Sequence, residues 1–170
     1  MHNKKIFDDV YQRIIDTISS QFDEYEPPIK IAASFHLSLS FVYDILNHEN
    51  IDMKKDGNIK KYNMKQFIKL FNFNKNFKIY DDGSNVNNYL NNAINFEAKN
   101  PIESFYMNYL VDTYGEFATA KEIASELKIS DKFVYEEILA GNIQALALGT
   151  RRIIITRSLI YYFREMIYAS

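Results

Sequence analysis

Residues 119–157 read TAKEIASELKISDKFVYEEILAGNIQALALGTRRIIITR, and the fold that we expect for the chain follows mainly from them. Thr119 is followed three residues later by Glu122, which is the spacing of a capping box and predicts that a short helix begins here. Ser130 is a favoured N-cap residue and predicts a second helix directly afterwards. Gly141 is a typical residue just past the end of a helix, so the second helix is expected to stop there.

Two β-rich runs follow this pair of helices, at 143–148 and 151–155. The dipeptide Gly149-Thr150 between them predicts a hairpin turn. A closing helix is expected over residues 156–167. The order helix, turn, helix, hairpin, helix is that of a winged helix-turn-helix, in which the hairpin is the wing.

The same pattern occurs twice in the chain. When residues 31–71 are laid on residues 123–163 at a constant offset of 92 and without a gap, 11 of 41 positions are identical. The offset also relates two apolar stripes that have the four-residue spacing of one helical face, Val10, Ile14, Ile18 and Phe22 in the first copy and Ile102, Tyr106, Leu110 and Tyr114 in the second. Each copy is therefore expected to begin with a lead helix.

The first copy keeps the element order of the second copy with other residues at the boundaries. Pro27-Pro28 precedes its first helix, Ser38 caps its second helix, and Asp56-Gly57 marks the hairpin turn. Its last helix is expected over residues 64–71.

The fold class that follows is mainly α with small β wings, arranged as two winged helix-turn-helix modules. The first domain is expected over residues 1–72 and the second over residues 101–170. An Asn-rich linker joins them over residues 73–100, and we expect a helix in it. The residues that share one face of this helix are Val86, Tyr89, Leu90, Ala93 and Ile94.

The apolar positions of the paired helices predict which side chains are buried. In the second copy these are Ile123, Ala124, Leu127, Phe133, Val134, Ile138 and Leu139. The aromatic residues of both second helices lie beside apolar partners, which favours the core over base stacking; they are Phe41, Tyr43, Phe133 and Tyr135.

The residue order of the second copy resembles the excisionase and MerR-like family of winged helix-turn-helix DNA-binding domains. The matching segments are Ala120-Lys121-Glu122-Ile123-Ala124, Leu127-Lys128-Ile129-Ser130, Phe133-Val134-Tyr135, Gly141-Asn142-Ile143, Gly149-Thr150-Arg151-Arg152-Ile153 and Arg157-Ser158-Leu159. The first copy is more diverged, and it has Glu49 where the family has a turn glycine. The lead helices and the linker lie outside the resemblance.

The resemblance implies binding to double-stranded DNA, with the second helix in the major groove and the wing on the backbone or in the minor groove. The polar residues that this helix would present to the bases are Ser40, Asn47, His48, Asp131, Lys132 and Glu136. Basic residues gather at equivalent places on both wings and at the start of the following helices, where phosphate contacts are expected; they are Lys54, Lys55, Lys60, Lys61, Lys65, Arg151, Arg152 and Arg157.

These features predict a DNA-binding protein, acting as a transcriptional regulator or as a recombination accessory factor of a mobile element. Acidic residues argue for an alternative, because Asp44 and Glu136-Glu137 follow the Val-Tyr pair where the family usually has a basic residue. The alternative is a phage- or plasmid-encoded adaptor or inhibitor that keeps the fold without binding DNA. Its protein partner would be held by the aromatic-rich lead helices, and a homodimer also remains open.

Other classes find little support in the sequence. The formal net charge is −2, so a nucleic-acid partner must be argued from local charge, and the absence of cysteine excludes disulfides and thiolate metal sites. His2, His36 and His48 lack a metal-ligand spacing, and the five glycines form no phosphate-binding loop. We therefore expect no enzyme, no cofactor and no metal site. No apolar run is long enough to span a bilayer, and we expect a cytoplasmic protein.

Overall fold

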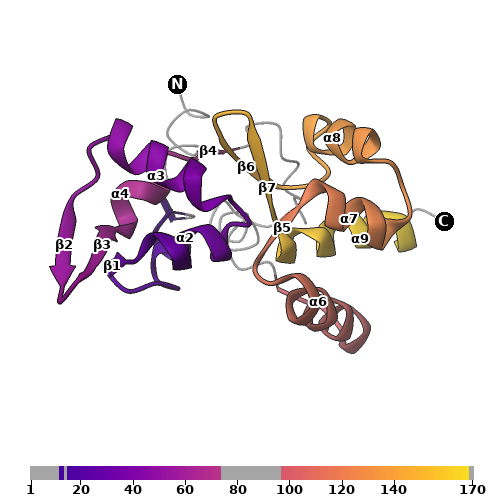
Figure 1. Ribbon diagram of the computed structural model, residues 1–170. Helices are drawn as coiled ribbons and strands as arrows, with labels where there is room; N and C mark the ends of the chain where they lie inside the picture. Colours follow the sequence, from indigo (N-terminus) through magenta and orange to yellow (C-terminus); the bar gives the residue numbers. More distant parts are fainter. Residues whose placement is uncertain (1–11, 14, 74–96, 169–170) are drawn as a thin grey trace, which may run out of the picture. The chain divides into compact units, whose positions relative to one another are not determined.

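The computed structural model describes residues 12–13, 15–73 and 97–168. The chain divides into two compact units, Met1–Asn72 and Phe73–Ser170 (Figure 1). The described part is mostly helical and carries two small antiparallel sheets. The helix expected between Val86 and Ile94 lies outside the described residues, as do Val10 and Ile14 of the first lead helix.

The first unit follows the order expected for the first copy. Residues 15–19 are helical and belong to the lead helix. They are followed by β1 (Tyr25–Glu26), α2 (Pro28–Ser34), α3 (Leu39–His48), β2 (Met53–Asp56), β3 (Ile59–Asn63) and α4 (Met64–Ile68). The last helix is thus shorter than the expected 64–71. The strands form one antiparallel sheet in the order β1-β3-β2.

Local side-chain chemistry sets the helix boundaries of the first unit. Pro28 occupies the first turn of α2, where its missing N–H costs nothing. The Ser38 hydroxyl accepts a hydrogen bond from the Phe41 N–H at 3.2 Å and caps α3 as predicted. The Asn63 side chain caps α4 in the same way, by accepting from the Gln66 N–H at 2.9 Å.

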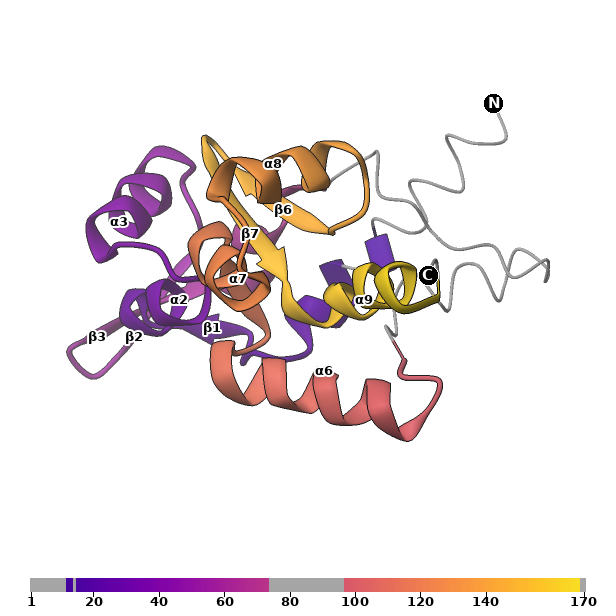
Figure 2. The same cartoon turned by 90° about the vertical axis from the view of Figure 1, so that its right-hand side faces the viewer.

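The second unit follows the order expected for the second copy. Its elements are α6 (Pro101–Tyr114), β5 (Phe117–Thr119), α7 (Ala120–Leu127), α8 (Asp131–Leu139), β6 (Ala145–Leu148), β7 (Arg151–Ile155), the 3-10 turn η1 (Thr156–Ser158) and α9 (Leu159–Tyr168). A two-residue strand, β4 (Asn72–Phe73), stands at the junction of the units. The sheet order is β4-β6-β7-β5. The lead helix α6 packs against η1 and α9 (Figure 2).

The capping box predicted at Thr119 is confirmed, with both reciprocal hydrogen bonds to Glu122 present. Ser130 caps α8 by accepting from the Phe133 N–H at 3.1 Å. Gly141 follows the end of α8 with φ 82°, in the left-handed region that glycine tolerates best. The boundaries of the two paired helices were therefore correctly predicted.

The offset of 92 also relates the backbone geometry of the two units. Every residue pairing between β1, β3 and β2 has its counterpart between β5, β7 and β6 at this offset. The same holds for connecting hydrogen bonds, in which the Met64 N–H donates to the Glu24 carbonyl at 2.9 Å and the Thr156 N–H donates to the Glu116 carbonyl at 3.0 Å. The two units are structural repeats, including their strand register.

One turn differs between the repeats, and the difference explains the missing glycine at Glu49. Helix α3 has 10 residues and α8 has 9, so α3 ends one residue later than α8 relative to the repeat. There Asn50 adopts the left-handed conformation, with φ 51°, that Gly141 adopts in the second unit. Asparagine is the other residue that tolerates this conformation well.

Each unit has its own apolar core. The first is rich in phenylalanine, and the ring centroids of Phe35 and Phe71 lie 5.1 Å apart. The second is built mainly from aliphatic side chains, which include Leu110, Ala118, Ile123, Val134, Ile138, Ile143 and Leu159. Leu127, Tyr106 and Tyr114 pack against this core while partly exposed.

Several residues assigned to the core are on the surface. Phe133 is 41% exposed and Leu139 is 70% exposed, so these two assignments are wrong. Tyr43 and Tyr135 are 43% and 45% exposed, and their assignment to the core is wrong as well. The physical reason is that α8 buries only two of its positions, four residues apart, and α3 does the same. A helix that packs along one narrow line leaves the flanking aromatic residues in solvent.

Candidate nucleic-acid interface

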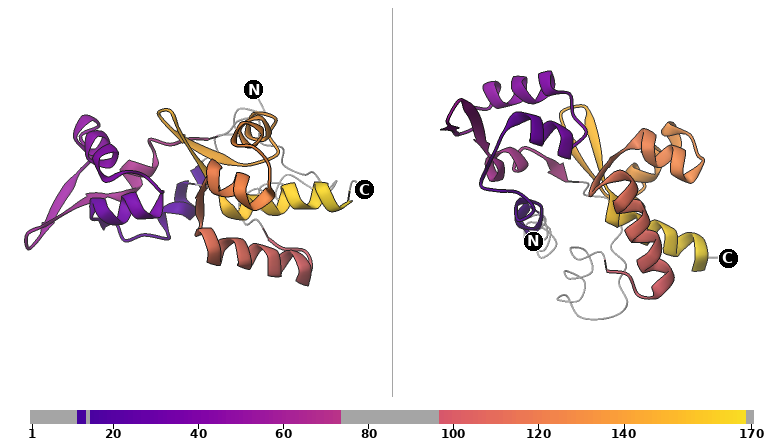
Figure 3. Two further views of the ribbon diagram at one scale, coloured as in Figure 1. Left: turned by 45° about the vertical axis from the view of Figure 1, so that its right-hand side comes forward. Right: turned by 60° about the horizontal axis from the view of Figure 1, so that its bottom comes forward.

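The hairpin β2–β3 carries four of the candidate phosphate-binding residues. Lys54 lies directly opposite Lys61, and Lys55 lies directly opposite Lys60. All four residues of β2 are exposed, and the hairpin extends away from the helices of its unit (Figure 3). Like charges in directly opposed positions destabilise a sheet. Folding stability therefore gives no reason for this arrangement.

The lysines of the hairpin differ in how far they are neutralised. Lys61 Nζ lies 2.7 Å from Asp56 Oδ2, and this hydrogen bond raises the pKa of Lys61 and lowers that of Asp56. Lys54 Nζ lies 4.0 Å from the centre of the Tyr25 ring. Within the described part of the chain, the side chains of Lys55 and Lys60 make neither an ion pair nor a hydrogen bond, although their main chains belong to the sheet. These two ammonium groups are available to an anionic ligand.

The basic residue at the start of the following helix is partly compensated. Lys65 lies in the first turn of α4, and its Nζ is 3.5 Å from Asp16 Oδ1 of the lead helix. Both side chains are about half exposed, so solvent screens this pair strongly. Lys65 thus contributes positive charge beside the hairpin, less than a free lysine would.

The hairpin of the second unit is not equivalent in its surface. Three of the four residues of β6 are buried, and the strand is entirely apolar. Arg151 and Arg152 are exposed at the start of β7, opposite Leu148 and Ala147. The Arg152 guanidinium donates to the carbonyl of Gly149 at 3.3 Å. Positive charge is confined here to the end of the hairpin.

Arg157 is bound to a carboxylate of its own unit. Its Nε and Nη2 donate to the two carboxylate oxygens of Glu116, each at 2.8 Å, and this raises the pKa of Arg157. Glu116 is 41 residues away in the sequence, so the local grouping of basic residues does not indicate this partner. Arg157 therefore differs from the other candidate phosphate-binding residues, because a carboxylate of its own unit already neutralises its charge.

The candidate base-reading residues all lie on the exposed sides of the second helices. Ser40, Asn47 and His48 are exposed on α3. Asp131, Lys132 and Glu136 are exposed on α8, where Lys132 Nζ is 3.7 Å from Glu136 Oε1. The two helices differ in character, because α8 presents more charged groups and the pairing of Lys132 leaves acidic groups in excess.

Sequence reasoning missed the two tyrosines at equivalent positions of these helices. Tyr43 and Tyr135 lie among the candidate base-reading residues, and both are exposed. The signal that reveals them is their position next to the buried stripe. Val42 and Val134 are fully buried, and the next residue along a helix points about 100° away.

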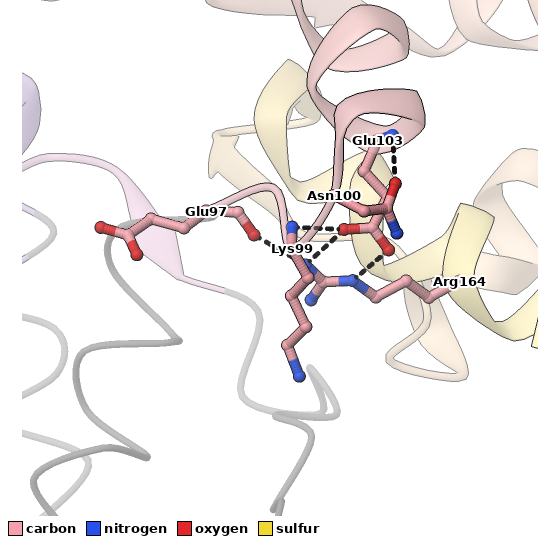
Figure 4. A network of polar contacts seen from close by, with 5 residues as sticks. All are labelled: Glu97, Lys99, Asn100, Glu103 and Arg164. Atoms are coloured by element: carbon pink, nitrogen blue, oxygen red, sulfur yellow. Dashed lines mark hydrogen bonds and ion pairs between the residues drawn. The ribbon is translucent and has the colours of Figure 1, made fainter.

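A buried ion pair holds the lead helix of the second unit (Figure 4). Arg164 Nε donates to Glu103 Oε1 and Arg164 Nη2 donates to Glu103 Oε2, both at 2.8 Å. Arg164 Nη2 also donates to the Glu97 carbonyl at 2.7 Å, and the Lys99 N–H donates to Glu103 Oε2 at 2.6 Å. The Asn100 side chain caps the helix by accepting from the Glu103 N–H. Arg164 lowers the pKa of Glu103.

This ion pair corrects the predicted face of the lead helix. Ile102, expected on the buried stripe, is 70% exposed, and Glu103 takes the inward position with 2% exposure. The sequence pattern could not indicate this, because burial of Glu103 depends on the guanidinium of Arg164, 61 residues later. Leu110 of the predicted stripe is buried as expected.

No family model, curated protein or solved structure matches this chain. In the described part of the chain, no group of three or more His, Asp or Glu side chains is arranged to hold a metal ion. No single helix there is long and apolar enough to cross a membrane, although α2 and α3 together, bent by 117°, pass the same length and composition test.

Proposed function

We propose that this chain is a double-stranded DNA-binding protein with two winged helix-turn-helix units, which acts in transcription or as a recombination accessory factor of a mobile element. The observation that carries the proposal is the set of opposed lysine pairs on the exposed hairpin β2–β3. The repeated order of helix, helix, hairpin and helix supports the assignment of this hairpin as a wing.

A polyanion explains the hairpin better than any internal role. Opposed lysines repel each other, and only Lys61 has an acidic partner on the hairpin itself. The negative charge of a phosphate backbone offsets this repulsion. In addition, each lysine that contacts a phosphate releases condensed counterions, which favours binding. Binding to DNA therefore converts a local cost in stability into affinity.

The test is the salt dependence of binding to a labelled duplex of random sequence. Four lysine–phosphate contacts predict a slope of log affinity against log salt of about −3.6, or a fall of about 150-fold between roughly 50 and 200 mM salt. Lys55→Ala and Lys60→Ala should each make the slope less steep, by about 0.9. Absence of binding at the lower salt concentration would refute the proposal.

The control variant is Lys121→Ala, which removes an exposed lysine from α7 of the other unit. It changes the net charge by the same amount as Lys55→Ala. It should leave the salt slope unchanged if the contacts lie on the hairpin. Equal effects of the two changes would show that binding follows the overall charge of the protein instead.

A second candidate is a protein-binding adaptor or inhibitor that does not bind DNA. The specific observation in its favour is the exposed side of α6, where Ile102, Phe105 and Tyr109 are 70%, 76% and 44% exposed at one-face spacing. The excess of acidic groups on α8 also favours it. This candidate predicts no binding to duplex at low salt, so the same titration separates the two functions.

A further inference from the structure

The arrangement of charge on β2–β3 indicates how the hairpin would meet DNA, given the proposed function. Side chains alternate between the two faces of a strand, and directly opposed residues share a face. The pair Lys54 and Lys61 therefore lies on one face of the hairpin, and the pair Lys55 and Lys60 lies on the other. A hairpin lying flat on a phosphate backbone would use only one of these faces.

Cations on both faces match a position between two rows of phosphates. The two backbones that border a groove of the duplex provide such rows on either side. The tip of the hairpin would then point to the floor of the groove. Apart from its chain neighbours, no atom of the described residues lies within 4 Å of the point where a Cβ of Gly57 would stand. The hairpin also projects from the helices of its unit (Figure 1 and the left view of Figure 3).

The residue that follows the turn at this tip is aliphatic. Ile59 directly follows the turn and is 55% exposed, although it is surrounded by charged and polar residues. Its opposed residue is Asp56, so it has no apolar partner across the strands. The Asp56 carboxylate is paired with Lys61, which reduces its repulsion of a phosphate backbone. The second unit has Arg151 at the equivalent position.

We propose that the hairpin β2–β3 enters the minor groove tip-first, with Ile59 as a wedge that partly unstacks a base step and kinks the duplex. Apolar side chains act in this way in other proteins that bend DNA through the minor groove. The favoured substrate is A·T-rich duplex with a flexible pyrimidine–purine step, such as TA.

The dimensions of the hairpin fit this placement. The minor groove is about 7.5 Å deep, and a strand rises about 3.3 Å per residue. With the turn residues 57–58 at the floor, Ile59 stands about 3 Å higher, beside the base edges. The pairs Lys55–Lys60 and Lys54–Lys61 then stand about 7 and 10 Å above the floor, at and just above the rim where the phosphates border the groove. The groove is only about 6 Å wide in straight B-DNA, so entry of two strands requires the opening that a kink provides.

The test measures the bend and the affinity together. A duplex with a central TA step in an A·T-rich context carries a donor and an acceptor dye at its ends, and its energy transfer reports the end-to-end distance. Wild-type protein should raise the energy transfer, and a duplex in which G·C pairs replace the central step should show a smaller rise. Ile59→Ala should leave the bound duplex straight. It should also bind at least about tenfold more weakly, because both the apolar contact and the hairpin entry that depends on the kink are lost.

The matched control is Ile29→Ala, which truncates a more exposed isoleucine, 68% exposed, on α2 of the same unit. It should leave both bend and affinity unchanged. If Ile59→Ala bends the duplex as the wild type does, the wedge is refuted while DNA binding stands. If wild-type protein binds no duplex at low salt, the proposed function itself fails, and the wedge fails with it.

Discussion

Removing the guanidinium of Arg164 should destabilise the second unit strongly. The variant Arg164→Met deletes the two hydrogen bonds to the Glu103 carboxylate and the one to the Glu97 carbonyl. It leaves Glu103, whose side chain is 2% exposed, as an uncompensated buried charge. Glu103 then retains the N–H of Lys99 as a donor.

The expected cost is at the lower end of the range for breaking a buried pair, about 3 kcal/mol, because that remaining donor still stabilises the carboxylate. In urea unfolding followed by far-ultraviolet circular dichroism, this lowers the midpoint by about 1.5 M for a slope of about 2 kcal/mol per M. The double variant Glu103→Leu with Arg164→Met should recover most of the loss, since apolar replacement of a whole buried pair is often neutral.

Acid provides an independent check of the same pair. The pKa of Glu103 in the folded protein lies below its unfolded value of about 4.3, so the stabilisation is fully present above that pH. It is lost as the pH falls through the folded pKa. Arg164→Met should remove this part of the acid dependence. The control Arg152→Met deletes an exposed arginine of the same unit and should change stability by less than about 0.5 kcal/mol.

Two outcomes would refute this reasoning. One is a loss below about 1 kcal/mol for Arg164→Met, which would mean that the carboxylate reaches solvent without its partner. The other is a double variant that loses the sum of the two single losses, which would mean that the two side chains stabilise the unit independently.

Four further substitutions have clear expected outcomes, and urea unfolding measures the change in stability for each. Thr119→Ala removes the cap of α7 and should cost about 1 kcal/mol, and an unchanged midpoint would contradict the role of the capping box. Lys128 and Gly141 both have positive φ, 54° and 82°, in the left-handed region that residues with a Cβ disfavour. Lys128→Gly should therefore stabilise the second unit by up to about 1 kcal/mol, and Gly141→Ala should destabilise it by about 1 to 2 kcal/mol. Changes of the same sign for the two variants would contradict this backbone argument. Arg157→Met should cost about 1 kcal/mol, because it removes the ion pair with Glu116, in which the two side chains are 37% and 32% exposed. It should leave the salt slope of DNA binding unchanged, and a less steep slope would show that Arg157 contacts phosphate after all.

The features that the sequence predicted well are those that depend on near neighbours. The capping box at Thr119, the cap at Ser130 and the glycine after α8 require only residues within four positions, so their chemistry can be read from a short window. The repeat at offset 92 then predicted the element order of the first copy from that of the second. This prediction is correct even at the turn where Asn50 takes the role of the glycine.

The features that the sequence predicted poorly depend on distant residues. The inward position of Glu103 and the neutralisation of Arg157 both arise from ion pairs across 41 or more residues. The exposure of Tyr43 and Tyr135 depends on how narrow a stripe each helix buries, which a hydrophobic pattern alone does not specify. The difference in exposure between the two hairpins, β2 fully exposed and β6 mostly buried, likewise depends on the packing of β6 in its unit.

The burial of β6 restricts which surfaces mutation can create. In the first unit any position of β2 accepts a charged side chain, because all four residues face water. In the second unit a lysine at Leu146 or Leu148, which are 1% and 4% exposed, would place an ammonium group in the apolar interior. Single substitutions can therefore vary the charge of the first hairpin freely, whereas in the second hairpin the residues open to such variation lie near the turn. Sequence change over time would preserve the difference between the two repeats rather than erase it.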